Sequence, residues 1–166
     1  STTLLADVPQ VFADVDRDGW PDIVVANGHI YPQVDGGTLE TSYAQKNQVF
    51  RSLGRDPAGQ IRFEEVAIEG GFSAKAVNRG LLCADFDDDG DQDVVVVRID
   101  GKPLIARNDT VSRGHWIGVA ITGPRRNRDG IGAALVVLDS NGRARRVERT
   151  YGGGFYSTSD PRLWMA

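Results

Sequence analysis

The sequence predicts an all-β protein, and three observations lead to that prediction. Hydrophobic residues alternate with polar ones in many short runs, as expected of strands that bury one face. Gly, Pro, Asn or Asp bounds each run, and the 166 residues include 20 glycines. No stretch of a dozen residues has the 3.6-residue period of an amphipathic helix. The apolar runs, among them residues 94–97, are far shorter than the ~20 residues that a membrane-spanning helix requires.

The expected strands follow one another closely, and each is a short run of branched, aromatic or alternating residues. In chain order they are residues 10–13, 23–26, 47–51, 61–66, 80–84, 94–98, 104–107, 116–121, 134–138 and 145–150. A helical turn is expected near residues 73–77. The polar, Gly-containing segment 27–46 is expected to be an inserted surface loop. Residues 139–142, with the sequence DSNG, predict a tight hairpin turn.

A nine-residue segment occurs twice, with an offset of 71 residues. Residues 14–22 have the sequence DVDRDGWPD, and residues 85–93 have the sequence DFDDDGDQD. Each copy follows an apolar strand that ends in Ala and precedes a strand of branched aliphatic residues. The chain between the copies supplies two more strands. One repeat therefore has about four strands, which is the size of a β-propeller blade.

The repeated segment predicts a metal site. Aspartates occupy its positions 1, 3, 5 and 9, and position 6 is a glycine, which permits a sharp reversal of the chain. Alternate side chains in so tight a loop converge, and converging carboxylates repel one another unless a cation lies between them. Oxygen ligands favour a hard cation. Ca²⁺ accepts six to eight oxygens in flexible geometry, whereas Mg²⁺ demands a strict octahedron. Two Ca²⁺ sites are therefore expected.

The expected ligands of the first site are Asp14, Asp16, Asp18, Asp22 and the backbone carbonyl of Trp20. Those of the second site are Asp85, Asp87, Asp89, Asp93 and the backbone carbonyl of Asp91. An EF-hand does not fit, because its twelfth position would be a valine in both copies and its flanks would be strands. The alternative to a metal site is an acidic hairpin loop that Asx-turns hold without a cation.

The repeat resembles the FG-GAP/VCBS blade of integrin-like β-propellers. With the following segment IVVANGHIYP at 23–32, it is similar to the ASPIC/UnbV family, which includes cartilage acidic protein-like secreted proteins. The segments that fit the blades of this family are 49–51, 62–66, 103–108 and 115–119. Residues 127–133 (NRDGIGA) and 153–163 (GGFYSTSDPRL) are similar to its terminal UnbV module. The resemblance covers nearly the whole chain.

The resemblance implies a domain organisation. Residues 1–70 would form a first blade with the inserted loop 27–46, residues 71–121 a second blade, and residues 122–166 a C-terminal UnbV-type β-module. A propeller closes with about four to eight blades. Two blades leave open sheet edges, which are sites of pairing with other chains. The chain is therefore expected to be a fragment, or a subunit whose open edges the rest of a longer chain or another subunit covers.

The resemblance also implies a calcium-binding protein that is exported, extracellular or periplasmic. The leading hypothesis is a non-enzymatic interaction or scaffolding module that contacts a protein or a glycan. No catalytic constellation is visible, since His29 and His115 have no nucleophile beside them and the single Cys83 lies in an apolar run. The alternatives are a subunit of a larger assembly, or part of a propeller enzyme that acts on polysaccharide.

The charges divide sharply along the chain. The net charge of −4 combines −9 over residues 1–110 with +5 over residues 111–166. Seven arginines between residues 125 and 149 are a candidate surface for an anionic partner. Nucleic acid is not expected, because Arg145 and Arg146 point to opposite sides of a strand. The acidic pI of about 5.1 belongs largely to the two Asp-rich segments.

Overall fold

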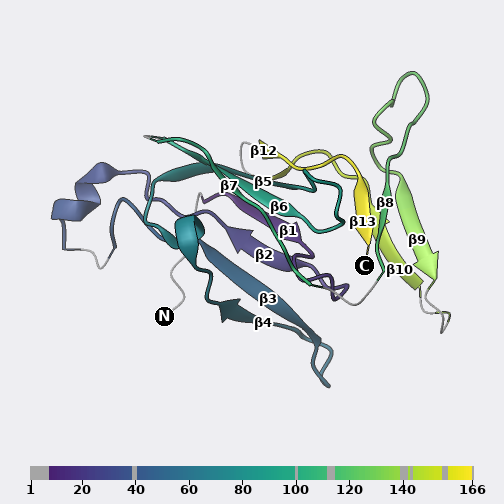
Figure 1. The fold of residues 1–166 in the computed structure, drawn as a ribbon, viewed down its shortest axis with the longest axis horizontal. Helices are drawn as coiled ribbons and strands as arrows, with labels where there is room; N and C mark the ends of the chain where they lie inside the picture. Colours follow the sequence, from purple (N-terminus) through teal and green to yellow (C-terminus); the bar gives the residue numbers. More distant parts are fainter. Residues whose placement is uncertain are drawn as a thin grey trace.

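The computed structural model describes residues 8–38, 41–99, 101–111, 115–138, 142, 144–154 and 157–165. It confirms the all-β prediction: the chain folds into several antiparallel sheets, and none of them closes on itself within these ranges (Figure 1). Two 3₁₀ turns, η1 (Pro32–Gly36) and η2 (Gly70–Ser73), are its helical elements in the described part of the chain. No helix there is long and apolar enough to cross a membrane.

The first sheet is a four-stranded meander in the order β1-β2-β3-β4. Its strands are β1 (Gln10–Ala13), β2 (Asp22–Val25), β3 (Gln48–Arg55) and β4 (Ile61–Val66). The β3–β4 register shifts between Ser52 and Arg55, where the Trp20 ring lies 3.2 Å from the position that a Cβ on Gly54 would take. The β1–β2 connection is the first Asp-rich segment, residues 14–21.

The second sheet repeats the first three strands of the first sheet. It consists of β5 (Asn78–Ala84), β6 (Asp93–Arg98) and β7 (Leu104–Ala106), in the order β5-β6-β7. The sequence offset of 71 places Ala84 at the end of β5 where Ala13 ends β1, and Asp93 at the start of β6 where Asp22 starts β2. The repeat found in the sequence is therefore a repeat of strands.

One hydrophobic core lies between the two sheets, and β1 contacts β5. Its buried side chains come from both copies of the repeat. They are Val11, Ala13, Val24, Ala26, Val49, Phe72, Leu81, Cys83, Val94 and Val96. Most of these residues lie at alternate positions of their strands, so their side chains share one face of each sheet. Because the two loops leave the same ends of neighbouring sheets, the shared core holds the loops beside each other.

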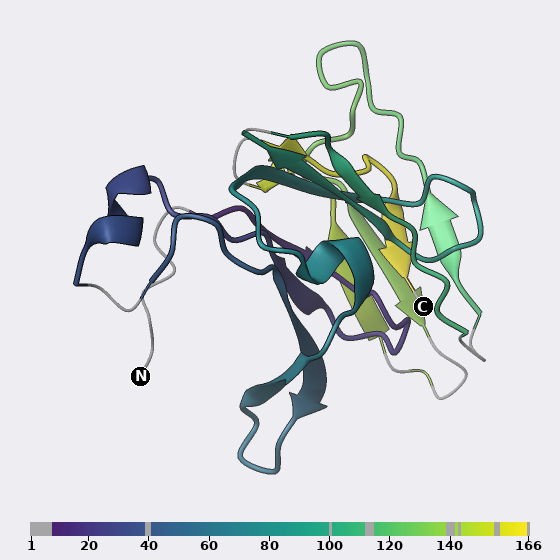
Figure 2. The same cartoon turned by 60° about the vertical axis from the view of Figure 1, so that its left-hand side comes forward.

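The inserted loop and the C-terminal strands lie at opposite ends of the molecule in both views (Figures 1 and 2). Three buried asparagines hold the base of the insertion. Asn47 Oδ1 accepts hydrogen bonds from the Asn27 backbone N–H (3.1 Å) and from Asn78 Nδ2 (2.8 Å). Asn47 Nδ2 donates to the Phe72 carbonyl at 3.0 Å. The insertion is thus tied to the core at its root, while η1 projects from the far end.

The C-terminal part forms three short two-stranded ladders. They are β9 (Ala134–Leu138) with β10 (Ala144–Glu148), β11 (Gly153–Gly154) with β12 (Ser157–Thr158), and β8 (Ile117–Val119) with β13 (Leu163–Met165). The strand β13 returns from the end of the chain to pair with β8, so Leu163 lies opposite Val119. This pairing places the C-terminus beside the second sheet.

Part of the sheet edge that the sequence predicts to be open is covered by the chain itself. The Leu81 N–H of β5 donates to Ser157 Oγ at 3.0 Å, and the Cys83 N–H donates to Ser159 Oγ at 3.2 Å. The Asp160 N–H in turn donates to the Cys83 carbonyl at 2.9 Å. Residues 157–160 therefore satisfy the outer backbone groups of β5, which an exposed edge strand would present to another chain.

The expected elements and the observed ones differ in a few places. The predicted helical turn near residues 73–77 is instead η2 at Gly70–Ser73, because Gly70 (φ 74°) and the buried Phe72 begin the turn earlier. The inserted loop contains η1, and three short strands after residue 150 have no counterpart among the predicted ones. The predicted hairpin turn at 139–142 falls outside the described residues, except for Gly142.

Candidate metal centres

The two Asp-rich loops have the same backbone conformation. Position 4 of each loop has a positive φ, at 57° in Arg17 and 58° in Asp88. The glycines at position 6, Gly19 and Gly90, have φ values of 88° and 93°. Two positive-φ residues within three positions fold each segment into a tight loop, which a non-glycine at position 6 would strain.

The aspartate at position 1 organises each loop by accepting backbone N–H groups. In the first loop, Asp14 Oδ1 accepts from Asp18 N at 3.0 Å, and Asp14 Oδ2 accepts from Gly19 N at 2.9 Å. In the second loop, Asp85 accepts from Asp89 N (3.2 Å) and from Gly90 N (3.0 Å). Each carboxylate oxygen has two lone pairs, so a second acceptor direction remains for a cation.

The aspartate at position 9 joins each loop to its sheet. Asp22 Oδ2 accepts from Val15 N at 3.0 Å, and its Oδ1 accepts from Ser52 N on β3 at 2.7 Å. Asp93 repeats this arrangement with Phe86 N at 2.9 Å and Asn108 N at 2.8 Å. Both carboxylates are buried. Each one therefore closes its loop and binds it to the third strand or to the segment that follows it.

Carboxylate oxygens from positions 1, 3 and 5 converge in both loops. One oxygen from each of Asp14, Asp16 and Asp18 lies within 4.8 Å of the others, and Asp85, Asp87 and Asp89 form the equivalent group. These distances are short enough for the three oxygens to share one metal ion. Asp22 and Asp93 stand outside these two groups.

The donor set fits a hard cation. All six converging side chains offer carboxylate oxygen, and neither group contains a His or Cys among the described residues. Oxygen-only sites select Ca²⁺ or Mg²⁺ over zinc and the softer transition metals. Position 1 is half-buried or buried while position 5 is exposed in both loops, so an ion would be reached from the solvent side.

Burial makes the negative charge of the first loop costly. Desolvation, opposed by the Gly19 N–H and reinforced by the neighbouring aspartates, raises the pKa of Asp14 to about 6. Desolvation also raises the pKa of Asp16 and of Asp22. In the second loop, desolvation and then Asp89 raise the pKa of Asp87. A bound cation would remove the repulsion that contributes to these shifts.

Position 7 differs between the loops. Trp20 in the first loop is half-buried and packs over Gly54 of β3. Asp91 in the second loop is only 1% exposed, and its Oδ2 accepts from Thr110 N at 3.1 Å. Burial, followed by contact with Asp89, raises the pKa of Asp91 to about 7. The second loop therefore holds an additional buried carboxyl group that the first one lacks.

Side chains from elsewhere in the chain cover the two glycines at position 6. A Cβ on Gly19 would lie 1.9 Å from Nη1 of Arg145, and a Cβ on Gly90 would lie 2.1 Å from the Trp116 ring. Arg145 lies on β10, and Trp116 immediately precedes β8. Both loops are thus covered by the C-terminal third of the chain, each by a different kind of side chain.

The side chains at position 4 extend to neighbouring segments. Arg17 donates to the backbone carbonyls of Asp89 (3.3 Å) and Thr110 (2.8 Å), which links the first loop to the second. Asp88 forms an ion pair with Arg162 at 2.8 Å. Arg162 also donates to the Asp85 carbonyl at 2.8 Å. The loops are consequently joined to each other and to the C-terminus.

The residues that hold the loops in place were not predicted from the sequence. Arg17, Trp116, Arg145 and Arg162 lie far from the Asp pattern or at variable positions within it, and local spacing carries no signal for them. Asn108 begins the triplet Asn-Asp-Thr, which is a potential glycosylation signal. Its Nδ2, the atom that glycosylation would modify, donates to the Val15 carbonyl at 2.7 Å.

The other nucleophilic and metal-binding side chains form no site in the described part of the chain. His29 Nδ1 accepts from Tyr31 N at 3.0 Å within the insertion, and His115 is exposed. Cys83 is buried in the core, where desolvation raises the pKa of its thiol to about 12. The thiol therefore stays protonated and unreactive at neutral pH.

Comparison with known proteins adds no assignment. No protein-family model matches the chain, and no curated protein matches it.

Proposed function

We propose that the protein is a calcium-binding, non-enzymatic interaction or scaffolding module that acts outside the cytoplasm. The observation that carries the proposal is the duplication: two loops repeat the same aspartate triad, the same positive-φ positions and the same backbone hydrogen bonds. An acidic hairpin without a metal role would need only its Asx-turns. Repeating three converging, mutually repelling carboxylates in both copies is better explained by a cation.

The chemistry supports Ca²⁺ in particular. Asp14, Asp16 and Asp18 would hold one ion, and Asp85, Asp87 and Asp89 the other. Asp22, Asp93 and the carbonyls at position 7 are the proposed additional ligands. Ca²⁺ tolerates irregular coordination by carboxylates and carbonyls, whereas Mg²⁺ requires an octahedron and retains water. Each ion would neutralise the converging carboxylates and so fix the conformation of its loop, which is a structural role.

The wider proposal is that the chain belongs with FG-GAP/VCBS propeller blades and an ASPIC/UnbV-like C-terminal module. The four-stranded meander β1-β4 supports a first blade at 1–70, and β5-β7 with the second loop supports a second blade at 71–121. The short ladders of β9 to β13 support a separate module at 122–166. Export is part of the same proposal, because it is what the resemblance implies.

Calcium titration of the metal-free chain tests the proposal. At a free Ca²⁺ concentration 100-fold above the dissociation constant, each site should add about 2.7 kcal/mol to the free energy of unfolding. Asp16→Ala should remove the contribution of the first site and Asp87→Ala that of the second. Calorimetry should count two ions bound to the unaltered chain and one bound to each variant.

Asp129→Ala is the matched control, since Asp129 is an exposed aspartate outside both loops. This variant should bind two ions with unchanged affinity. The proposal is wrong if the unaltered chain melts at the same temperature with Ca²⁺ and with chelator and if calorimetry detects no binding.

A further inference from the structure

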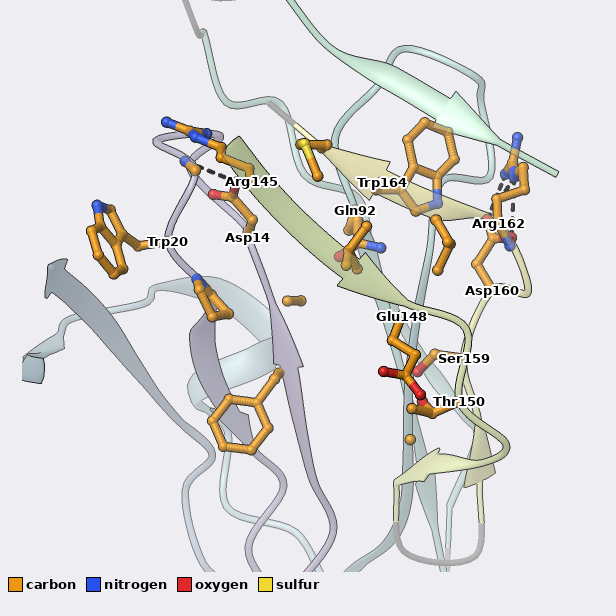
Figure 3. A pocket seen from close by; sticks show the side chains of 18 of the residues that line it. Asp14, Trp20, Gln92, Arg145, Glu148, Thr150, Ser159, Asp160, Arg162 and Trp164 are labelled. Carbon is orange, nitrogen blue, oxygen red and sulfur yellow. Dashed lines mark hydrogen bonds and ion pairs between the residues drawn. The ribbon is translucent and has the colours of Figure 1, made fainter. Parts of the chain in front are cut away.

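A cleft of about 760 Å³ lies beside the first Asp-rich loop. Figure 3 shows Asp14 and Trp20 on one side of it and Arg162 and Trp164 toward the other, with Arg145 and Glu148 along β10 between them. Residues of β1 also line it. The cleft therefore lies where the first sheet meets the C-terminal strands, and a volume of this size is typical of small-molecule and oligosaccharide sites.

The described lining of the cleft is cationic. It includes six arginines against three carboxylates, an excess of three positive charges in a chain whose net charge is −4. The arginines are Arg17, Arg55, Arg145, Arg146, Arg149 and Arg162, and the acids are Asp14, Glu148 and Asp160. Calcium bound beside Asp14 would cancel one of these three negative charges. The low-dielectric walls of a cleft concentrate the electrostatic field of these positive charges, which favours an anionic ligand.

Three of the arginines, Arg17, Arg55 and Arg149, form no ion pair with a carboxylate among the described residues. Arg17 is already held by the carbonyls of Asp89 and Thr110. Arg55 donates to the Gly59 carbonyl and Arg149 to the Thr150 carbonyl, at 2.7 and 2.8 Å. By contrast, Arg146 pairs with Glu148 at 2.8 Å, within the same cleft. A neutral carbonyl leaves the positive charge of a guanidinium uncompensated. Arg55 and Arg149 are therefore the groups best placed to form charge-assisted hydrogen bonds with a ligand carboxylate or sulfate.

The same cleft offers aromatic surfaces. Phe12 on β1 is 65% exposed and Trp116 is 41% exposed, while Trp20 and Trp164 are half-buried; all four line the cleft. Trp116 and Trp164 lie against each other, with their ring centroids 5.4 Å apart. Flat rings beside arginines match the C–H face and the acidic group of a charged sugar ring.

We infer that this cleft binds an acidic oligosaccharide, with the aromatic rings against the sugar faces and Arg55 and Arg149 on its carboxylate or sulfate groups. The inference deepens the proposed interaction function. It rests on the calcium proposal only in that a bound Ca²⁺ would neutralise the negative charge of Asp14. An extended peptide would need a free strand edge, but residues 157–160 occupy that of β5 and Gly154 lies against the Gln10 carbonyl of β1. The aromatic rings of the lining favour a sugar over a polyphosphate, which has no apolar face to lie against them.

The unaltered chain gives the first test, in calcium-containing buffer. A hyaluronan octasaccharide, which carries a carboxylate on every second sugar, should bind in a calorimetric titration and should weaken as NaCl is raised. A neutral chitin hexasaccharide should bind at least tenfold more weakly. The inference is overturned if neither sugar binds, if both bind equally, or if a glutamate octapeptide or a thymidine decanucleotide binds as tightly as the octasaccharide.

Variants then place the site. The double variant Arg55→Gln, Arg149→Gln should weaken octasaccharide binding at least tenfold, as expected when charge-assisted hydrogen bonds are lost. Phe12→Ser should also weaken it. The matched controls are Arg62→Gln and Phe63→Ser on β4, outside the cleft lining, and they should bind as the unaltered chain does. Unchanged binding by the double variant would overturn the assignment to this cleft.

The calcium proposal and the cleft can fail separately. If calorimetry counts two Ca²⁺ ions but no octasaccharide binds, the cleft inference falls and the calcium proposal stands. If the octasaccharide binds and responds to the cleft variants while no Ca²⁺ binds, the cleft inference stands and the calcium proposal falls.

Discussion

The two Asp-rich loops have nearly the same internal geometry but different surroundings. In both, position 1 accepts the backbone N–H groups of positions 5 and 6, and position 9 accepts that of position 2. Outside the loops the likeness ends. Arg145 covers Gly19 in the first loop, whereas Trp116 covers Gly90 in the second. Position 4 is a cation in the first loop and an anion in the second.

The comparison separates two kinds of position within one motif. Positions 1, 3, 5, 6 and 9 determine the shape of the loop and are the same in both copies. Positions 4 and 7 determine what the loop contacts. Arg17 donates to carbonyls around the second loop, while Asp88 pairs with Arg162 near the C-terminus. The same loop shape can therefore occur twice in the chain while each copy contacts different neighbouring segments.

The largest expected effect tests what the loops share. Asp22→Ala and Asp93→Ala each leave two backbone N–H groups without their acceptor, one of them in the neighbouring strand or segment. An unsatisfied buried donor costs about 1–3 kcal/mol, so each variant should lose about 2–5 kcal/mol of unfolding free energy in urea titrations. A large loss in one loop and none in the other would contradict their equivalence.

The next effect tests how the loops differ. Gly90→Ala puts a Cβ into the Trp116 ring at a φ of 93°, and an indole that packs against the Trp164 ring has little freedom to move away. We expect a loss of about 2–4 kcal/mol from overpacking and backbone strain together. Gly19→Ala meets only the flexible end of Arg145, so its loss should be about 1–2 kcal/mol. Urea unfolding of both variants measures the difference, and equal losses would contradict this account.

A smaller effect tests the connections between loops and neighbours. Arg162→Gln loses the ion pairs with Asp160 and Asp88 and the hydrogen bond to the Asp85 carbonyl. Because the Arg162 side chain is 30% exposed, we expect a loss of only about 1–2 kcal/mol in thermal unfolding. Arg107→Gln is the control, as its carboxylate partners are exposed, and it should unfold like the unaltered chain. A control as destabilised as Arg162→Gln would refute a specific connection.

The smallest effect concerns pH. The folded chain raises the pKa of Asp14 to about 6, whereas an unfolded Asp titrates near ~4. The folded state therefore binds more protons, and without Ca²⁺ its stability should fall as pH rises from about 4 to about 6. Protons also compete with Ca²⁺ at Asp14, so Ca²⁺ affinity of the Asp87→Ala chain should fall up to tenfold per pH unit below about 6.

The second loop should respond to pH at a different point. Asp91, with its pKa raised to about 7, has no counterpart at Trp20. In the Asp16→Ala chain, Ca²⁺ affinity should rise between about pH 6 and 8, because the Asp91 carboxyl loses its proton there. Adding Asp91→Asn should remove that rise. Calorimetric titrations at several pH values measure both loops, and identical pH profiles would mean that position 7 does not distinguish them.

Much of the fold followed from local pattern. The strands at 10–13, 61–66 and 134–138 have the predicted bounds. The offset of 71 residues also correctly identified β5 as the equivalent of β1 in the repeat, and β6 as the equivalent of β2. Strand alternation and turn residues act over a few positions, so they are visible in one sequence. The ladders β11–β12 and β8–β13 were not predicted, because strands of two or three residues carry too little pattern.

The sequence by itself determined the two loops: the Asp spacing and the glycine at position 6 dictate a tight turn with converging carboxylates, whatever surrounds it. Only the tertiary structure decided that Arg145 and Trp116 cover these loops, that Ser157 and Ser159 close the edge of β5, and that arginines and aromatic rings meet in one cleft. The physical reason is distance along the chain. Local geometry depends on neighbouring residues, while these contacts join residues that lie between 26 positions (Gly90 and Trp116) and 126 positions (Gly19 and Arg145) apart.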